Sequence, residues 1–158
     1  MLALGAFGCG GGQRPATPAP QTPNEALTKF LEAVKANDLG RMGSLWGTER
    51  GPAAAFLDDN QLKRRLATIQ VHWDHKGYRI VDGPLPAQPL SATFKNVPSA
   101  DRLRDFRVEL QRANGCSPVI PITLVRTNQG GWLIYDAHLE SAGNPAARCP
   151  TTPPGTRP

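Results

Sequence analysis

The chain changes its hydrophobic period about halfway along its 158 residues. Between residues 23 and 70, apolar side chains recur every three to four positions, as on one face of an α-helix. From residue 77 onward, they alternate with polar side chains, as on a half-buried β-strand. Helices followed by strands predict an α+β fold, with the N-terminal helices packed on one face of an antiparallel sheet.

The first predicted helix has a clear start signal. Thr22 can cap the helix, Pro23 suits its first position, and Glu25 completes a capping box. The apolar residues that follow lie at i, i+3, i+4 and i+7, which places them on one face. They are Leu27, Phe30, Leu31 and Val34.

Two further helical stretches follow. Asp38 is a suitable cap for a short second helix. A third stretch covers residues 53–70, with a break near Asp58 and Asp59. The residues expected to face inward are Leu39, Met42, Leu45, Trp46, Phe56, Leu62, Leu66 and Ile69.

The second half of the chain predicts a curved antiparallel sheet of four to six strands. Residues 103–111 show the clearest alternation of apolar and polar side chains, and "TNQGG" suits a hairpin turn. The candidate strands are residues 77–83, 89–97, 102–112, 117–127 and 131–140. The core is expected to contain Phe30, Leu31, Trp46, Phe106, Leu124 and Leu133.

The first twelve residues, "MLALGAFGCGGG", place a cysteine after an apolar segment and before three glycines. The segment Ala6-Phe7-Gly8-Cys9 resembles the lipobox of bacterial lipoprotein signals, with Ala6 where leucine is commonest. The resemblance implies that residues 1–8 are the remainder of a signal and that Cys9 carries lipid. An incidental free cysteine is the alternative.

The resemblance also implies a location. Gly10, rather than aspartate, follows the cysteine, and in that family this indicates the outer membrane, facing the periplasm. Residues 9–22 then form the lipidated cysteine and a Gly/Pro-rich tether with a reach of about 40 Å. Several acyl chains would anchor the protein stably in the cell envelope.

Two cysteines remain once Cys9 is set aside. In an oxidising compartment an even number of cysteines suggests a bridge, here between Cys116 and Cys149. The bridge would pin the Pro-rich tail, residues 141–158, to the domain. Two free cysteines are the alternative.

The net charge of +5 does not indicate a nucleic-acid interface. Arginines are interleaved with acids, as in residues 101–105, and only 6% of residues are aromatic. Nucleic-acid binders usually gather basic residues on one face with aromatic platforms. We therefore expect no nucleic-acid partner and, at most, mild attraction to an anionic membrane surface.

The stretch "VHWDHKG" contains the densest group of catalytic residue types. His72, Asp74 and His75 could serve as metal ligands or as an acid–base pair. Local sequence supplies no complete ligand set, and a polar connection with Trp73 turned inward explains the stretch as well. We expect neither a metal nor a cofactor here.

The helices of "ALTKFLEAVKANDLGRMGSLW" and the final hairpin, "ITLVRTNQGGWLIYDAHLE", resemble the nuclear-transport-factor-2-like (cystatin-like) superfamily. The resemblance covers residues 23–140 and implies a cone, in which a curved sheet wraps a long helix. Some enzymes of the superfamily, related to ketosteroid isomerases and polyketide cyclases, use a carboxylate or histidine in the cone as base. Asp136 and His138 alternate on the last predicted strand, on the face of Trp132 and Ile134. The alternative is that both side chains lie on the outer face or near the end of the strand, exposed to solvent.

These observations lead to one functional expectation. The chain is expected to be an anchored envelope lipoprotein whose domain binds a small apolar ligand or an envelope protein, without catalysis. No residue is assigned a catalytic role. The alternative is an isomerase- or cyclase-like enzyme that uses Asp136 or His138 as base.

Overall fold

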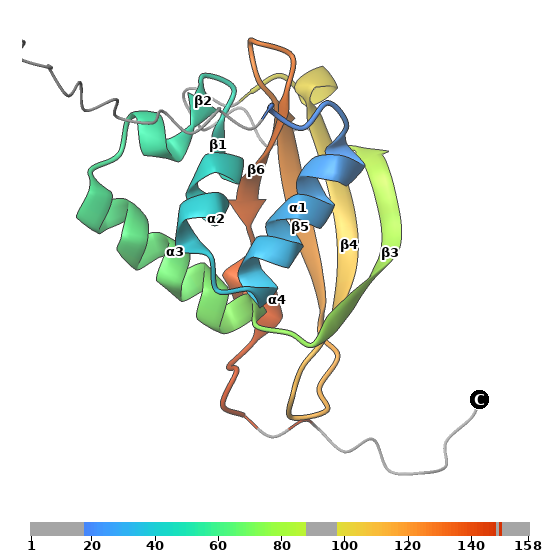
Figure 1. Cartoon of the computed structure of the whole chain (residues 1–158). Helices are drawn as coiled ribbons and strands as arrows, with labels where there is room; N and C mark the ends of the chain where they lie inside the picture. Colours follow the sequence, from blue (N-terminus) through green and yellow to red (C-terminus); the bar gives the residue numbers. More distant parts are fainter. Residues whose placement is uncertain (1–17, 88–97, 148, 150–158) are drawn as a thin grey trace, which may run out of the picture.

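The computed structural model describes residues 18–87, 98–147 and 149. Its helices gather on one side of a twisted sheet (Figure 1). The helices are α1 (Pro23–Lys35), α2 (Leu39–Leu45), α3 (Asp59–Trp73) and the short α4 (Leu139–Ala142), with 3-10 turns η1 (Ala53–Ala55) and η2 (Ala100–Arg102). The strands are β1 (Gly47–Thr48), β2 (Gly51–Pro52), β3 (Gly77–Pro86), β4 (Leu103–Gln111), β5 (Val119–Arg126) and β6 (Trp132–Ala137). The predicted α+β fold is confirmed.

Four strands form the main sheet, in the order β3-β4-β5-β6, and all neighbours are antiparallel. The predicted strand at residues 89–97 falls outside the described residues. Register shifts between Ile80 and Leu85 interrupt the pairing of β3 with β4. Such irregularities bend a strand and increase its twist, which curves this side of the sheet.

Side-chain caps begin α1 and α2 where the sequence predicted. The Thr22 hydroxyl accepts a hydrogen bond from the amide of Glu25 at 3.2 Å, and Pro23 is the first helical residue. The Asp38 carboxylate accepts from the amide of Arg41 at 2.9 Å and starts α2. These bonds satisfy amides that have no partner within the helix.

One large apolar core lies between the helices and the inner face of the sheet. Phe30 of α1 and Trp73 of α3 meet edge to face there, with ring centroids 5.9 Å apart. Trp46 is half-buried and packs against the same core. The sheet contributes Phe106, Val108, Leu110, Ile120, Ile122, Leu124, Trp132 and Ile134.

One expectation about the core needs correction. Phe56 is 44% exposed, because Asp58 caps α3 and leaves Phe56 ahead of the helix rather than on its apolar face. Leu133 is buried as expected, in a second core cluster with Leu103 and Val125. Alternation along β6 places Leu133 on the opposite face of the sheet from Trp132 and Ile134.

The segment ahead of α1 contacts the domain. Pro20 is buried, and its carbonyl accepts a hydrogen bond from the amide of Trp132 at 2.8 Å. Residues 18–21, which the sequence placed in the tether, therefore lie along the start of β6. We call residues 18–21 the strap.

Candidate functional site

Asp136 and His138 do not share the face of Ile134. Ile134 pairs with Leu124, whereas Asp136 pairs with Thr123, so one extra residue is inserted in β6 between these pairs. Directly paired residues share a face of the sheet. The bulge therefore turns Asp136 away from the core, and His138 lies beyond the end of the strand.

The two side chains lie near each other on the surface. His138 Nε2 is 3.7 Å from Asp136 Oδ2, and His138 Nδ1 is 3.3 Å from Glu140 Oε1. The Asp136 side chain is 53% exposed, and that of His138 is 29% exposed. Both side chains are accessible to water, so Asp136 is not the buried carboxylate that the alternative function requires.

Asp136 lines an open groove of about 250 Å³ between α3 and β6. Trp46 and Ile69 form its apolar side, and Arg65 lies at its margin. Tyr135 also lines the groove, and partial burial raises the pKa of its hydroxyl, with the nearby Asp136 adding to the shift. Ala137 and Leu139 complete the lining of the groove, whereas the larger side chains of the inner face, such as Phe106 and Ile122, are packed in the core.

His72, Asp74 and His75 are not brought together. His72 lies on α3 and bonds the carbonyl of Thr68, whereas His75 is buried beyond the helix end. The ring of His75 contacts Tyr78 edge to face, and its Nδ1 lies 2.7 Å from the carbonyl of Trp73. Burial lowers the pKa of His75. Among the residues that the structure describes, no three potential ligands gather as a metal site would require.

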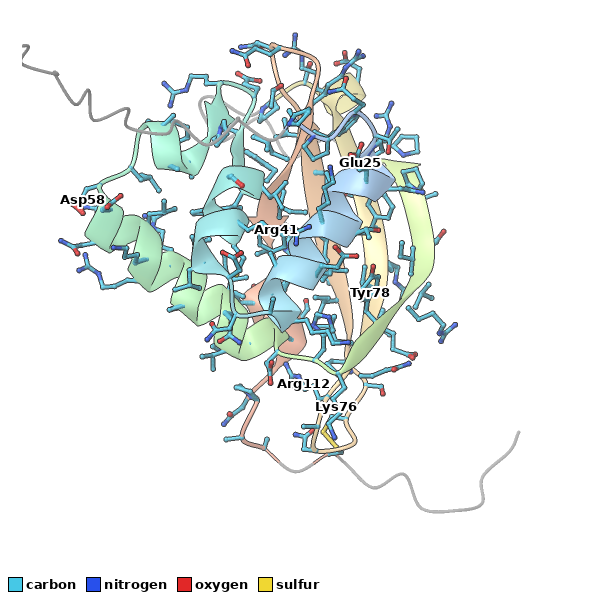
Figure 2. All side chains as sticks on the ribbon, viewed as in Figure 1. Glu25, Arg41, Asp58, Lys76, Tyr78 and Arg112 are labelled. Atoms are coloured by element: carbon cyan, nitrogen blue, oxygen red, sulfur yellow. A yellow bond between two sulfur atoms is a disulfide. The ribbon has the colours of Figure 1, made fainter. Side chains whose placement is uncertain are left out.

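The structure joins Cys116 to Cys149 by a disulfide, with Cα atoms 5.4 Å apart. A cavity of about 490 Å³ lies beside the bridge. Arg112 lines it and donates hydrogen bonds to the carbonyls of His72, at 2.5 Å, and Ala142, at 2.8 Å. Arg112 thus ties α3 and α4 to the β4–β5 turn at the lower end of the molecule (Figure 2).

A further cavity, of about 520 Å³, lies at the opposite end, under the strap. Its walls come from the strap, α1, α2, β2 and the β5–β6 turn. Its volume lies within the range of roughly 300–1,000 Å³ that is typical of small-molecule sites. The described lining residues are Pro18, Ala19, Pro20, Lys29, Arg41, Ser44, Leu45, Gly51, Pro52, Thr127, Gln129 and Leu133.

The charges at this cavity are arranged around α1 and α2 (Figure 2). Lys29 Nζ lies 2.6 Å from Glu25 Oε1, and the amide of Gln21 donates to Glu25 Oε2 at 2.9 Å. Both hydrogen bonds lower the pKa of Glu25, and the bond from Lys29 has the larger effect. Arg41 pairs with Glu32 at 3.3 Å across the α1–α2 contact.

Sequence reasoning missed this cavity. The Glu25–Lys29 pair at i, i+4 is visible in the sequence, but it is equally typical of any solvated helix. Arg41 and Leu133 are brought to the cavity only by tertiary packing. Pro18 and Pro20 were interpreted as part of an extended spacer.

Comparisons with known proteins do not identify a family for this chain. No family model matches the chain, and a search of curated proteins finds no match. A similar solved structure is that of a protein from Campylobacter jejuni described as a proposed NTF2-like transpeptidase. It matches 73% of this chain and 100% of its own length, with a TM-score of 0.42 and 14% identity. Similarity at this level carries no argument about activity.

None of the helices in the described parts of the chain has the length and apolar character needed to span a bilayer. Cys9 and the rest of residues 1–17 lie outside the described part, so the lipidation of Cys9 stays a prediction.

Proposed function

We propose that this chain is a lipid-anchored protein of the cell envelope whose α+β domain binds a small ligand or a partner protein without catalysing a reaction. The anchor is Cys9, and the tether delivers the domain to the periplasmic side of the outer membrane. The cavity under the strap is the proposed ligand site. The resemblance to the nuclear-transport-factor-2-like superfamily, whose folds often hold ligands, supports this proposal.

The position of Asp136 is the observation that supports a binding function without catalysis. A general base in the cone would need a carboxylate among apolar side chains, where burial shifts its pKa toward neutrality. Asp136 is instead half-exposed on the outer side of the bulge in β6. The inner face of the sheet is occupied by packed apolar residues such as Phe106 and Ile122.

The anchor is tested by metabolic labelling. Cells of a bacterium with a lipoprotein pathway are grown with an alkyne fatty acid, and the wild-type chain is compared with Cys9→Ala. We expect label and membrane association only in the wild type, because the thiol is the attachment point. Cys116→Ala in parallel controls for nonspecific acylation of thiols. Equal labelling of wild type and Cys9→Ala would disprove the anchor.

The alternative function is tested at Asp136 and His138. The purified chain is assayed with apolar carbonyl substrates of isomerases and cyclases, alongside Asp136→Asn and His138→Ala. We expect no turnover by any of the three proteins. Turnover by the wild-type chain that is lost in Asp136→Asn, while the thermal unfolding of the variant is unchanged, would show that the chain is an enzyme.

A further inference from the structure

We propose that the cavity under the strap binds a small amphiphile with one anionic group, such as a carboxylate, on an apolar chain, and that docking of the strap completes the site. The inference rests on the proposed function, because it names the ligand class for the same cavity. Two features carry it: the chemistry of the lining and the contact between the strap and the β5–β6 hairpin.

The lining combines apolar residues with two cationic ones. Pro18, Pro20, Leu45, Pro52 and Leu133 offer a surface for a hydrocarbon chain. Lys29 and Arg41 are the charged residues among the described lining, and their carboxylate partners do not line the cavity. An anionic head group therefore meets cationic donors, and it shares Lys29 with the Glu25 carboxylate, whose Oε1 lies 2.6 Å from Lys29 Nζ.

Both cations keep donors for a ligand. A lysine has three N–H donors, and the single contact of Lys29 with Glu25 leaves two of them. The pair between Arg41 and Glu32 is exposed on both sides, 43% and 55%, and such pairs hold their side chains weakly. Arg41 can thus turn its guanidinium to a bound carboxylate.

The strap is coupled to Lys29, one of the two cations, through Glu25. One oxygen of the Glu25 carboxylate accepts from the Gln21 amide of the strap, and the other contacts Lys29. A second bond joins the strap to β6, from the Trp132 amide to the Pro20 carbonyl. Because a ligand in the cavity touches the docked strap, ligand binding and strap docking must stabilise each other.

Gly131 reveals how closely the strap fits. A Cβ atom built on Gly131 would lie 2.7 Å from the Cβ of Ala19, closer than real Cβ contacts allow. Gly131 does not have a positive φ, so alanine is compatible with its backbone. Gly131→Ala should therefore displace the strap without straining the hairpin, and Ala19→Gly in the same chain should remove the clash.

The experiment uses the full chain, labelled with ¹⁵N, and two probes of equal length, octanoate and 1-octanol. We expect octanoate to bind and to change the chemical shifts most strongly at the amides of Gln21 and Trp132. Hydrogen exchange of both amides should also slow. Gly131→Ala should lower the affinity for octanoate about tenfold, and the double variant Ala19→Gly/Gly131→Ala should restore most of this affinity. Lys29→Gln/Arg41→Gln should also weaken octanoate about tenfold, the loss expected for a charge-assisted hydrogen bond, while 1-octanol changes little.

Several results would overturn this inference. They are the absence of octanoate binding, shifts centred on the groove between α3 and β6, and octanoate affinity unchanged in Gly131→Ala or in the double charge variant. If Gly131→Ala fails to fold, the restored double variant and the charge variant still decide the outcome. The anchor is judged separately by labelling of Cys9, so either proposal can fail while the other stands.

Discussion

Removal of the Cys116–Cys149 bridge should lower the free energy of unfolding by about 4 kcal/mol. The bridge spans 33 positions of sequence and closes a loop that contains β5, β6 and α4. For a loop of this size, the chain-entropy relation gives a loss of about 12.5 cal mol⁻¹ K⁻¹ in the entropy of the unfolded chain. This corresponds to about 3.7 kcal/mol of stabilisation at 25 °C. The stabilisation arises chiefly in the unfolded chain, which the bridge prevents from expanding.

The native contacts near the bridge contribute much less. The Asn114 side-chain amide donates to the carbonyls of Pro145 and Ala147, both at 3.4 Å, and these bonds are exposed. Arg112 holds the carbonyl of Ala142 independently of the bridge. The folded domain should therefore keep its sheet and its main core when the bridge is absent.

The assay is urea unfolding followed by tryptophan fluorescence, since Trp73 is fully buried. Cys116→Ala/Cys149→Ala is compared with the oxidised parent, both in a Cys9→Ser background that prevents exchange. The unfolding slope m should rise, because the unfolded chain exposes more surface without the bridge. Asn114→Ala serves as the matched control, because it removes only native contacts. A loss below about 1 kcal/mol in the double variant, or one no larger than that of Asn114→Ala, would refute the loop-entropy reasoning.

Two further predictions follow from the core. Phe30→Ala should lower the free energy of unfolding by about 4 kcal/mol in urea titrations, because it empties a fully buried site against Trp73, whereas Phe56→Ala should change it by less than about 1 kcal/mol. Similar losses for the two variants would contradict the placement of Phe56 outside the core. Stability should also fall as the pH drops below about 6.5, because burial depresses the pKa of His75 in the folded state and the unfolded chain then binds the proton more readily. His75→Gln should flatten this part of the pH profile of unfolding, whereas the control variant His72→Gln should not. An unchanged profile in His75→Gln would show that His75 does not cause the pH dependence.

Much of the helical half could be predicted because its signals are local. Thr22 and Asp38 cap their helices through bonds that span only three residues. The stripe that includes Phe30 follows from helical geometry alone. Phe56 was misplaced because the competing cap at Asp58 was interpreted as a break within a helix rather than as its start.

The strands could be located, but the faces of their side chains could not always be predicted. Alternation along β4 is regular and placed Phe106 correctly in the core. In β6 a single inserted residue reverses the alternation between Ile134 and Asp136. No local sequence signal marks this bulge, because the bulge depends on the register of β6 with β5. The predicted face of Asp136, the candidate base, was therefore wrong.

The sequence by itself determined the order of the main helices and strands and, once Cys9 is set aside, the pairing partner open to Cys116. These features depend on periodicity, caps and cysteine parity, which act over short distances or by simple counting. Only the tertiary structure decided that Asp136 faces outward and that the strap, Lys29 and Arg41 meet around one cavity. Strand register and the docking of distant segments arise from packing of the whole chain, so residues far apart in sequence become neighbours without any signal between them.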